Sequence, residues 1–195
     1  ATGDSFPDVG ATLSVEYASF PTLASCATAA CSGGLDFITL SKSFRVRSDR
    51  QGTWLDAART MARLTGMGAA GFCAEVPATA EDITAGVQLL AEQRDGWGSV
   101  EISLPDDAVT SIDDLAASAE LARSRGVKFT VCVAARDVTD SLAEMIGSLA
   151  DAVWLVTKDP SEARDVREKL QSIARGLGRS LAVLVELGVV ISGNL

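Results

Sequence analysis

The sequence contains no histidine. Without an imidazole, neither a Ser-His nor a Cys-His catalytic pair can form, and the G-x-S-x-G turn that presents a nucleophilic serine is also missing. Hydrolase chemistry of these kinds is therefore excluded. The cysteines follow no metal-ligand spacing, and no D-x-D or E-x-x-H pattern occurs. The sequence accordingly predicts no metal site.

Long apolar runs are also missing, since none approaches the roughly 20 residues that a membrane span needs. The first ten residues, ATGDSFPDVG, carry no basic region and do not resemble a signal peptide. Acidic residues outnumber basic ones by 26 to 17, and the net charge of −9 opposes long-range attraction to nucleic acid or anionic membranes. We expect a soluble, cytoplasmic protein that binds neither.

Four cysteines, Cys26, Cys31, Cys73 and Cys132, lie mostly among small apolar residues. Buried structural thiols have such neighbours, and a reducing cytosol keeps them unpaired. We predict that all four are reduced and that at least three are largely buried.

With 195 residues, of which 47% are hydrophobic, the chain has enough residues for one well-buried core, and we assign a single domain over 1–195. Short apolar, β-branched runs alternate with helix-like patterns. Their spacing is typical of right-handed βα units and predicts a parallel sheet covered by helices. The predicted strands are 12–17, 35–40, 70–76, 98–104, 127–135, 152–157 and 181–191.

The strands at 127–135 and 181–191 are apolar on both faces, as in a barrel or a doubly wound sheet. A phosphate-binding GxxxxGK[ST] loop and a GxGxxG turn after a strand are both absent, which favours the barrel. The doubly wound sheet remains the alternative.

Apolar residues at helical spacing predict the covering helices. Asp159, Pro160 and Glu162 are a strong start signal, because a capping carboxylate precedes a proline at the first helical position. Gly176 and Gly178 are expected to end that helix. The other expected helices are 54–64, 83–90, 112–122 and 142–149.

In a (βα) barrel, functional residues gather at the C-terminal ends of the strands. The loop at 41–50 is locally basic in an acidic protein, with Ser41, Ser43 and Arg45 near its start, and it is suited to attract a phosphate or a flavin. The alternative is a solvated loop whose arginines pair with nearby acids.

Two glutamates, Glu75 and Glu101, lie in predicted strands that are neighbours in a barrel. Paired carboxylates suggest acid–base chemistry or a metal. The alternative, which the absence of histidine favours, is solvation at the strand ends or a salt bridge to Arg45 or Arg136. Asp36, within another apolar run, is interpreted as structural.

The segments GLDFITLSKSF at 34–44 and RDGW at 94–97 resemble the luciferase-like flavin monooxygenases. This resemblance implies a reduced TIM-type (βα) barrel with about seven parallel strands, and a flavin-dependent monooxygenase or oxidoreductase homologue. It implies reduced FMN or the deazaflavin F420 at the C-terminal end of the barrel, while no catalytic residue is assigned. The candidate cofactor-binding residues are Ser41, Ser43, Arg45, Glu75, Ser103 and Arg136.

The sequence departs from this family at the phosphate-binding loop, where Ala135, Arg136 and Asp137 replace Gly-Ser-Ser. Asp137 would repel a phosphate, and the lost glycine hinders close backbone approach, so we predict weak or absent flavin binding. One alternative function is a non-catalytic subunit or a flavin- or small-molecule-binding protein of the same fold. Another is an unrelated barrel lyase or aldolase, for which Lys158 is the lysine nearest a strand end.

The sequence between the strands at 98–104 and 127–135 is long enough for only one helix. The segment that covers the substrate in the family is therefore expected to be absent. Its loss would expose apolar surface. We therefore expect a homodimer, or a heterodimer with a homologue, in which Trp54 and Met61 contribute apolar contacts.

Overall fold

The structure is a computed structural model of the whole chain. The residues that it describes are 10–13, 17–18, 25, 28–29, 32–33, 37–40, 45–46, 59, 62–63, 71–92, 98–104 and 112–187.

Seven parallel strands form the main sheet, and they follow one another in the sheet in the same order as in the chain. Each of the seven apolar runs in the sequence gives one of these strands, although the first strand begins two residues earlier than predicted and ends at Leu13. The strands are β1 (Gly10–Leu13), β3 (Phe37–Leu40), β5 (Gly71–Glu75), β6 (Gly98–Leu104), β7 (Lys128–Ala134), β8 (Ala152–Thr157) and β9 (Ala182–Leu187). A second, two-stranded sheet pairs β2 (Tyr17–Ala18) with β4 (Arg45–Val46).

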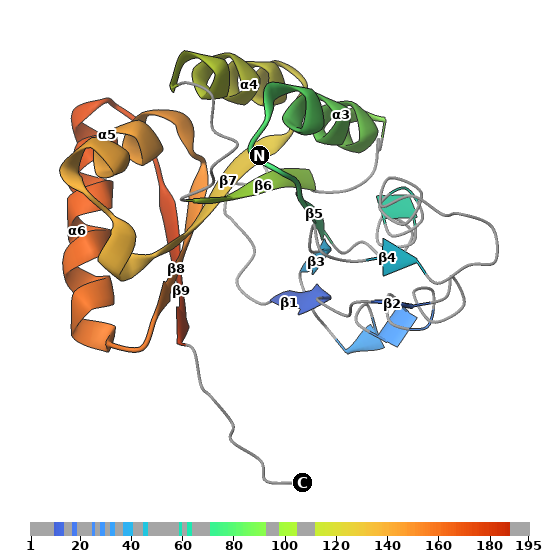
Figure 1. Cartoon of the computed structure of the whole chain (residues 1–195), viewed down its shortest axis with the longest axis horizontal. Coiled ribbons are helices and arrows are strands. Elements are labelled where there is room, and N and C mark those ends of the chain that lie inside the picture. The colour runs from blue at the N-terminus through green and yellow to red at the C-terminus, as the bar shows by residue number, and fades with distance from the viewer. Residues whose placement is uncertain are drawn as a thin grey trace, which may run out of the picture.

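This strand order shows a TIM-type α/β arrangement. A doubly wound sheet requires a reversal of strand order with helices on both faces. Here the order is β1-β3-β5-β6-β7-β8-β9 without reversal, and Figure 1 shows the helices following one another around the outside of a curved sheet. Within the described residues, β1 and β9 are the two edges of this sheet. The sheet is therefore an open, barrel-like one.

The last helix begins at Pro160, where its sequence signal predicted, and two of the other expected helices begin two or three residues earlier than their first apolar residue. Thr79 Oγ1 accepts a hydrogen bond from Asp82 N at 3.1 Å, and Thr139 and Asp159 cap their helices in the same way. The last helix ends before Gly178, whose φ of 70° is the left-handed conformation that favours glycine. The helices are α3 (Ala80–Ala91), α4 (Ile112–Ser124), α5 (Asp140–Leu149) and α6 (Pro160–Gly176), and a short 3₁₀ turn, η1, spans Ala135–Asp137.

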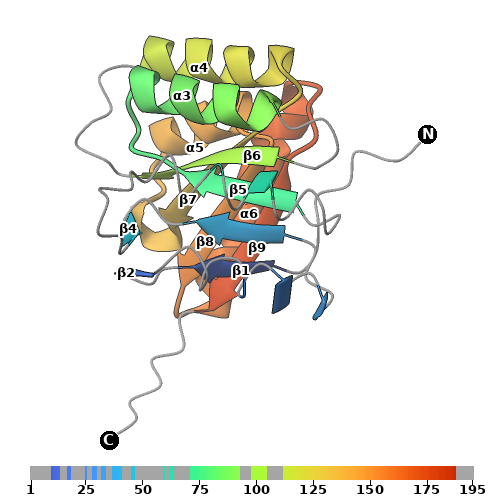
Figure 2. The same cartoon turned by 90° about the vertical axis from the view of Figure 1, so that its right-hand side faces the viewer.

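The hydrophobic core lies between the helices and the convex face of the sheet (Figures 1 and 2). Two glycines allow close packing there. A Cβ on Gly86 would lie 3.2 Å from Val100, and one on Gly147 would lie 2.7 Å from Ile173, so α3 sits tightly on β6 and α5 on α6. Strand side chains in this core include Phe72, Ala74, Val100, Ile102, Phe129, Val131, Val153 and Leu155.

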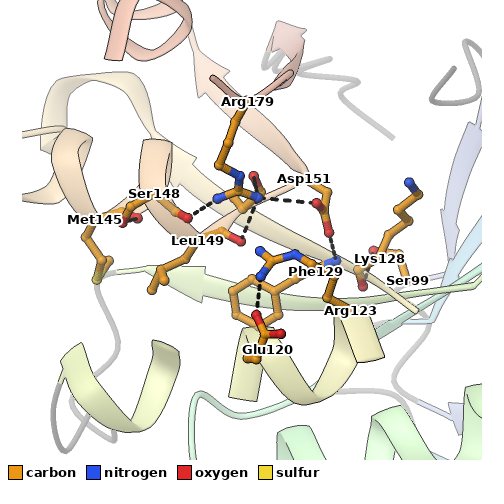
Figure 3. Close-up of polar contacts among 11 residues, drawn as sticks. Ser99, Glu120, Arg123, Lys128, Phe129, Met145, Ser148, Leu149, Asp151 and Arg179 are labelled. Atoms are coloured by element: carbon orange, nitrogen blue, oxygen red, sulfur yellow. Dashed lines mark hydrogen bonds and ion pairs between the residues drawn. The ribbon is translucent and has the colours of Figure 1, made fainter. Parts of the chain in front are cut away.

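Arg179 joins the C-terminal end of α5 to the sheet, as Figure 3 shows. Its guanidinium donates to the carbonyl oxygens of Ser148, Leu149 and Ala150, which the helix leaves without intrahelical partners. The same group lies 3.4 Å from Asp151 Oδ1, while Asp151 Oδ2 accepts from the backbone N–H of Phe129 at 2.9 Å. These contacts hold the end of α5 and the starts of β7 and β8 together at the N-terminal end of the sheet.

The cysteine prediction is tested for two of its residues. Cys73 is buried and Cys132 is half-buried, and neither forms a disulfide. Cys26 and Cys31 lie outside the described residues, as do Trp54, Met61 and Asp36. Of the helices that the structure describes, none is long and apolar enough to cross a membrane.

Candidate functional site

Polar side chains gather on the concave face of the sheet, opposite the helices. Successive residues of a strand point to opposite faces, so Val100 and Ile102 of β6 pack against helices while their neighbours face the concave side. Parallel pairing then places residues of adjacent strands in rows across this face. The concave residues used below are Cys73, Glu75, Ser99, Glu101, Ser103, Thr130, Cys132, Trp154 and Glu186.

The strand register brings Glu75 and Glu101 side by side. Glu75 is the last residue of β5, and Glu101 is the middle residue of β6. Ser103 Oγ donates to Glu75 Oε1 at 2.8 Å, and Cys73 Sγ donates to Glu101 Oε2 at 3.4 Å. The proximity expected from neighbouring strands is thus confirmed, and each carboxyl accepts a hydrogen bond from the other's strand.

Glu101 is buried, with only 7% of its surface exposed. Burial disfavours the charged carboxylate and, with smaller repulsion from Glu75 and Glu186, raises the pKa of Glu101 from the ordinary 4.5 to about 7, although the Cys73 thiol opposes the shift. Both protonation states of Glu101 are therefore populated near neutral pH. Such a group is suited to take up and return a proton.

Cys132 lies on the next strand, beside Ser103 in the β6–β7 register. Burial, followed by repulsion from Glu101 and Glu75, raises the pKa of its thiol to about 12. The thiol therefore stays protonated at neutral pH. Because the thiolate is the nucleophilic form, Cys132 contributes a weak hydrogen-bond donor to this face and no nucleophile.

A hydroxyl pair borders the glutamates toward the N-terminal end of the sheet. Ser99 Oγ and Thr130 Oγ1 are 2.5 Å apart, and Ser99 Oγ also lies 3.3 Å from the carbonyl oxygen of Lys128. Both residues are buried, and each hydroxyl has a partner. These contacts hold β6 and β7 together beneath Glu101.

Of the other predicted site residues, Arg136 is not part of this group. It lies in η1 with an exposed side chain, 3.8 Å from Asp137, so the proposed salt bridge between Arg136 and the strand glutamates is wrong. The 3₁₀ turn after β7 directs the guanidinium outward, away from the concave face. Ser41 and Ser43 lie outside the described residues, and of Arg45 only its backbone position in β4 is described.

The turn at Ala135–Asp137 is followed by N–H groups that bond to the turn's own carbonyl oxygens. Val138 N donates to Ala135 O at 3.2 Å, and Thr139 N donates to Asp137 O at 3.1 Å. Thr139 Oγ1 accepts from the first turn of α5, where Asp140 adds a negative charge. These bonded N–H groups and acidic side chains make the turn a poor phosphate cradle.

The residues missed as members of the group were Cys73, Ser99, Thr130, Cys132, Trp154 and Glu186. A signal was present in the sequence, because β5 and β6 alternate between apolar and polar residues in CAE and SVEIS. Within the part of the chain that the structure describes, no cluster of three or more acidic or cysteine side chains could hold a metal ion. Two shallow hollows, of about 270 and 240 Å³, lie beside α6 and away from the glutamates.

No protein-family model matches the sequence, and no curated protein matches it. Solved structures match the fold. Orotidine 5′-monophosphate decarboxylase from Methanocaldococcus jannaschii has a TM-score of 0.62 at 13% identity, and the match covers 94% of this chain and 91% of that one. Tryptophan synthase from Pyrococcus furiosus has a TM-score of 0.60 at 15% identity, with 92% and 78% covered.

Deoxyribose phosphate aldolase from Aeropyrum pernix has a TM-score of 0.57 at 16% identity, and the match covers 89% of this chain and 73% of that one. At such identities the likeness shows the fold alone. The chain has a TIM-type α/β fold that resembles several barrel enzymes. None of these three proteins is described as a luciferase-like monooxygenase.

Proposed function

We propose that this chain is a barrel enzyme that transfers a proton at a small-molecule substrate, with Glu101 as the proton-transfer group and Glu75 as its partner. The observation that carries the proposal is the Glu75–Glu101 pair itself. The two carboxyls are adjacent on the concave face, and the more buried one has a pKa of about 7. A buried carboxyl with a raised pKa beside a second carboxyl is a recurrent arrangement for acid–base catalysis.

The chemistry follows from burial and charge. Ionised Glu101 would accept a proton from a C–H or O–H bond of the substrate, leaving the bonding electron pair on the substrate, and protonated Glu101 would return it. Glu75 and Glu186 add negative charge to the same surroundings. The substrate is therefore proposed to be neutral or cationic rather than a polyanion.

Proton transfer can be tested before the substrate is known. The protein is incubated in D₂O with mixtures of carbonyl compounds, amines and amino acids, and deuterium uptake is followed by mass spectrometry. We expect at least one compound to exchange with the wild type, and Glu101→Gln to abolish the exchange. Glu168→Gln, at an exposed position of α6, is the matched control and should leave exchange unchanged. Equal exchange with wild type and Glu101→Gln would contradict the proposal.

A second candidate is a luciferase-like flavin-dependent monooxygenase or oxidoreductase homologue that uses FMN or F420. The sequence segments at 34–44 and 94–97 favour it, and the TIM-type fold agrees with it at the level of fold. In this candidate, cofactor binding would be weak because Asp137 places an acidic residue in the turn and the N–H groups that follow it, those of Val138 and Thr139, already donate to Ala135 O and Asp137 O. The same fold without turnover, as a non-catalytic subunit or a small-molecule-binding protein, is the corresponding non-enzymatic candidate.

Titration of FMN against intrinsic fluorescence, with Trp154 on the concave side of β8, distinguishes these candidates. Loss of charge-assisted hydrogen bonds from the phosphate loop should leave a millimolar dissociation constant, because each such bond contributes about 1.5–3 kcal/mol. Arg136→Ala should leave that constant unchanged. Submicromolar binding that Arg136→Ala abolishes would instead support the flavin enzyme.

The proposed assembly is a homodimer, or a heterodimer with a homologue. The aldolase named above is described as tetrameric and the tryptophan synthase as a complex, but those descriptions concern the two proteins themselves. Sedimentation at micromolar concentration tests the proposal directly. A single species of 20.2 kDa would contradict homodimerisation.

A further inference from the structure

The two glutamates accept hydrogen bonds from chemically different donors. Ser103 of β6 donates a hydroxyl to Glu75 of β5, at 2.8 Å. Cys73 of β5 donates a thiol to Glu101 of β6, at 3.4 Å. Each strand thus supplies one carboxyl and the donor for the other strand's carboxyl. The donors differ in strength, because a thiol is a weak hydrogen-bond donor and a hydroxyl is a good one.

We propose that Cys73 and Ser103 are positioning residues that divide the proton unequally, because the weaker donor leaves Glu101 as the carboxyl that holds it. A hydrogen bond to a carboxylate stabilises its charged form, and a stronger donor stabilises it more. The thiol therefore stabilises the charged form of Glu101 only weakly, whereas the stronger donor, the hydroxyl, serves Glu75. The catalytic meaning of this division rests on the function proposed above, but the division itself does not.

The surroundings of Glu101 act in the same direction. Among the groups facing it, Glu75 from β5 and Glu186 from β9 repel its negative charge. The Cys73 and Cys132 thiols come from the strands on either side, and Lys128 begins β7 one row nearer the N-terminal end. Burial adds the largest contribution and raises the pKa of Glu101 to about 7. The pKa of Glu101 should therefore respond to substitutions at Cys73. A stronger donor there should lower it, and loss of the donor should raise it.

The test is a carboxyl titration followed by carbon-13 NMR from pH 4 to 9, with Glu101→Gln used to assign the signal. Cys73→Ser supplies a stronger donor and should lower the titration midpoint of Glu101 by about one pH unit. Cys73→Ala removes the donor and should raise the midpoint. A merely structural role for Cys73 would not move the midpoint in opposite directions. Unchanged midpoints, or shifts of the same sign, would overturn the proposal.

Ser103→Ala provides the reciprocal measurement. Without the hydroxyl, the carboxyl beside Glu101 loses its stronger donor, and the midpoint of Glu101 should fall. Ser172→Ala, at an exposed position of α6, is the matched control and should leave the midpoint unchanged. A midpoint that rises or stays constant in Ser103→Ala would contradict the role of Ser103, provided that circular dichroism shows a folded variant.

This titration and the deuterium-exchange experiment fail independently. Opposite midpoint shifts in the two Cys73 variants without deuterium exchange in any compound would leave the donor assignment standing and remove the proposed function. Exchange that depends on Glu101 without these shifts would support the function and remove the roles of Cys73 and Ser103.

Discussion

On β6, Val100 and Ile102 are completely buried against the helices, whereas Glu101 between them faces the concave side beside a second carboxyl. The same contrast occurs on β5 and β7. Phe72 and Phe129 lie in the core, and the adjacent Cys73 and Thr130 face the other way. One strand therefore has an apolar face that packs and a polar face that can perform chemistry.

The difference between the two faces shows how a buried carboxyl is tolerated. Burying Glu101 is unfavourable for its charged form, and its neighbours only partly compensate. The convex face contributes hydrophobic burial that depends on no charged group. Changes on the convex face should therefore affect stability at every pH, while changes to the buried carboxyl of the concave face should affect mainly its pH dependence.

The largest expected effect comes from the convex face. Phe129→Ala removes a ring that is 1% exposed, and should destabilise the protein by about 3–5 kcal/mol because both burial and packing are lost. Urea unfolding at pH 5 and pH 8 should give the same loss. A loss under 1 kcal/mol would mean that the helices do not pack on this face as described.

Glu101→Gln, on the concave face, should change how the stability of the protein depends on pH. A carboxyl whose folded pKa is raised contributes stability that is fully present below its unfolded pKa of about 4.5 and is lost as pH rises through about 7. The wild type should therefore lose up to roughly 3 kcal/mol over that window, and the variant should not. Urea unfolding from pH 4 to 8 measures this loss of stability, with Glu168→Gln as the control. Identical pH profiles for wild type and Glu101→Gln would refute the assignment.

Gly147→Ala probes the helix layer behind the convex face. The added Cβ would lie 2.7 Å from Ile173, so α5 and α6 must move apart at a cost of about 1–3 kcal/mol. Gly176→Ala is the matched control, because a Cβ there meets nothing within 4 Å. It should leave stability unchanged or raise it slightly. Thermal unfolding compares the two, and equal midpoints would contradict the close helix packing.

The smallest effect is expected at the hydroxyl pair of the concave face. Ser99→Ala leaves the buried Thr130 hydroxyl without its 2.5 Å partner and should cost about 1 kcal/mol. Adding Thr130→Val removes the hydroxyl that has lost its Ser99 partner, so the double variant should be at least as stable as Ser99→Ala. A double-mutant cycle by urea unfolding measures this coupling, and strictly additive losses would show that the two hydroxyls do not interact.

The fold was largely predictable from the sequence. Strand positions followed from apolar β-branched runs, and the start of the last helix from Asp159, because both signals are local. The parallel arrangement followed from the spacing of the strands. The first strand was misplaced because its alternation is short and no cap marks its start.

The candidate site was only half predictable. Glu75 and Glu101 could be paired from strand order alone, since neighbouring parallel strands place their ends together. The salt bridge to Arg136, one of three alternatives for the glutamates, is wrong, because sequence spacing does not show which way a turn directs a side chain. The Cys73 and Ser103 donors depend on a register of one strand against another, which no local pattern sets.

The sequence by itself determined the secondary structure, the parallel α/β architecture and the exclusion of histidine-dependent chemistry, because these depend on local periodicity and composition. Only the tertiary structure decided which polar residues share the concave face, which donor serves which carboxyl, and how far Glu101 is removed from water. The pKa of a carboxyl depends on burial and on charges brought close by folding. Its value therefore arises from residues that are distant in the chain and adjacent only in the folded sheet.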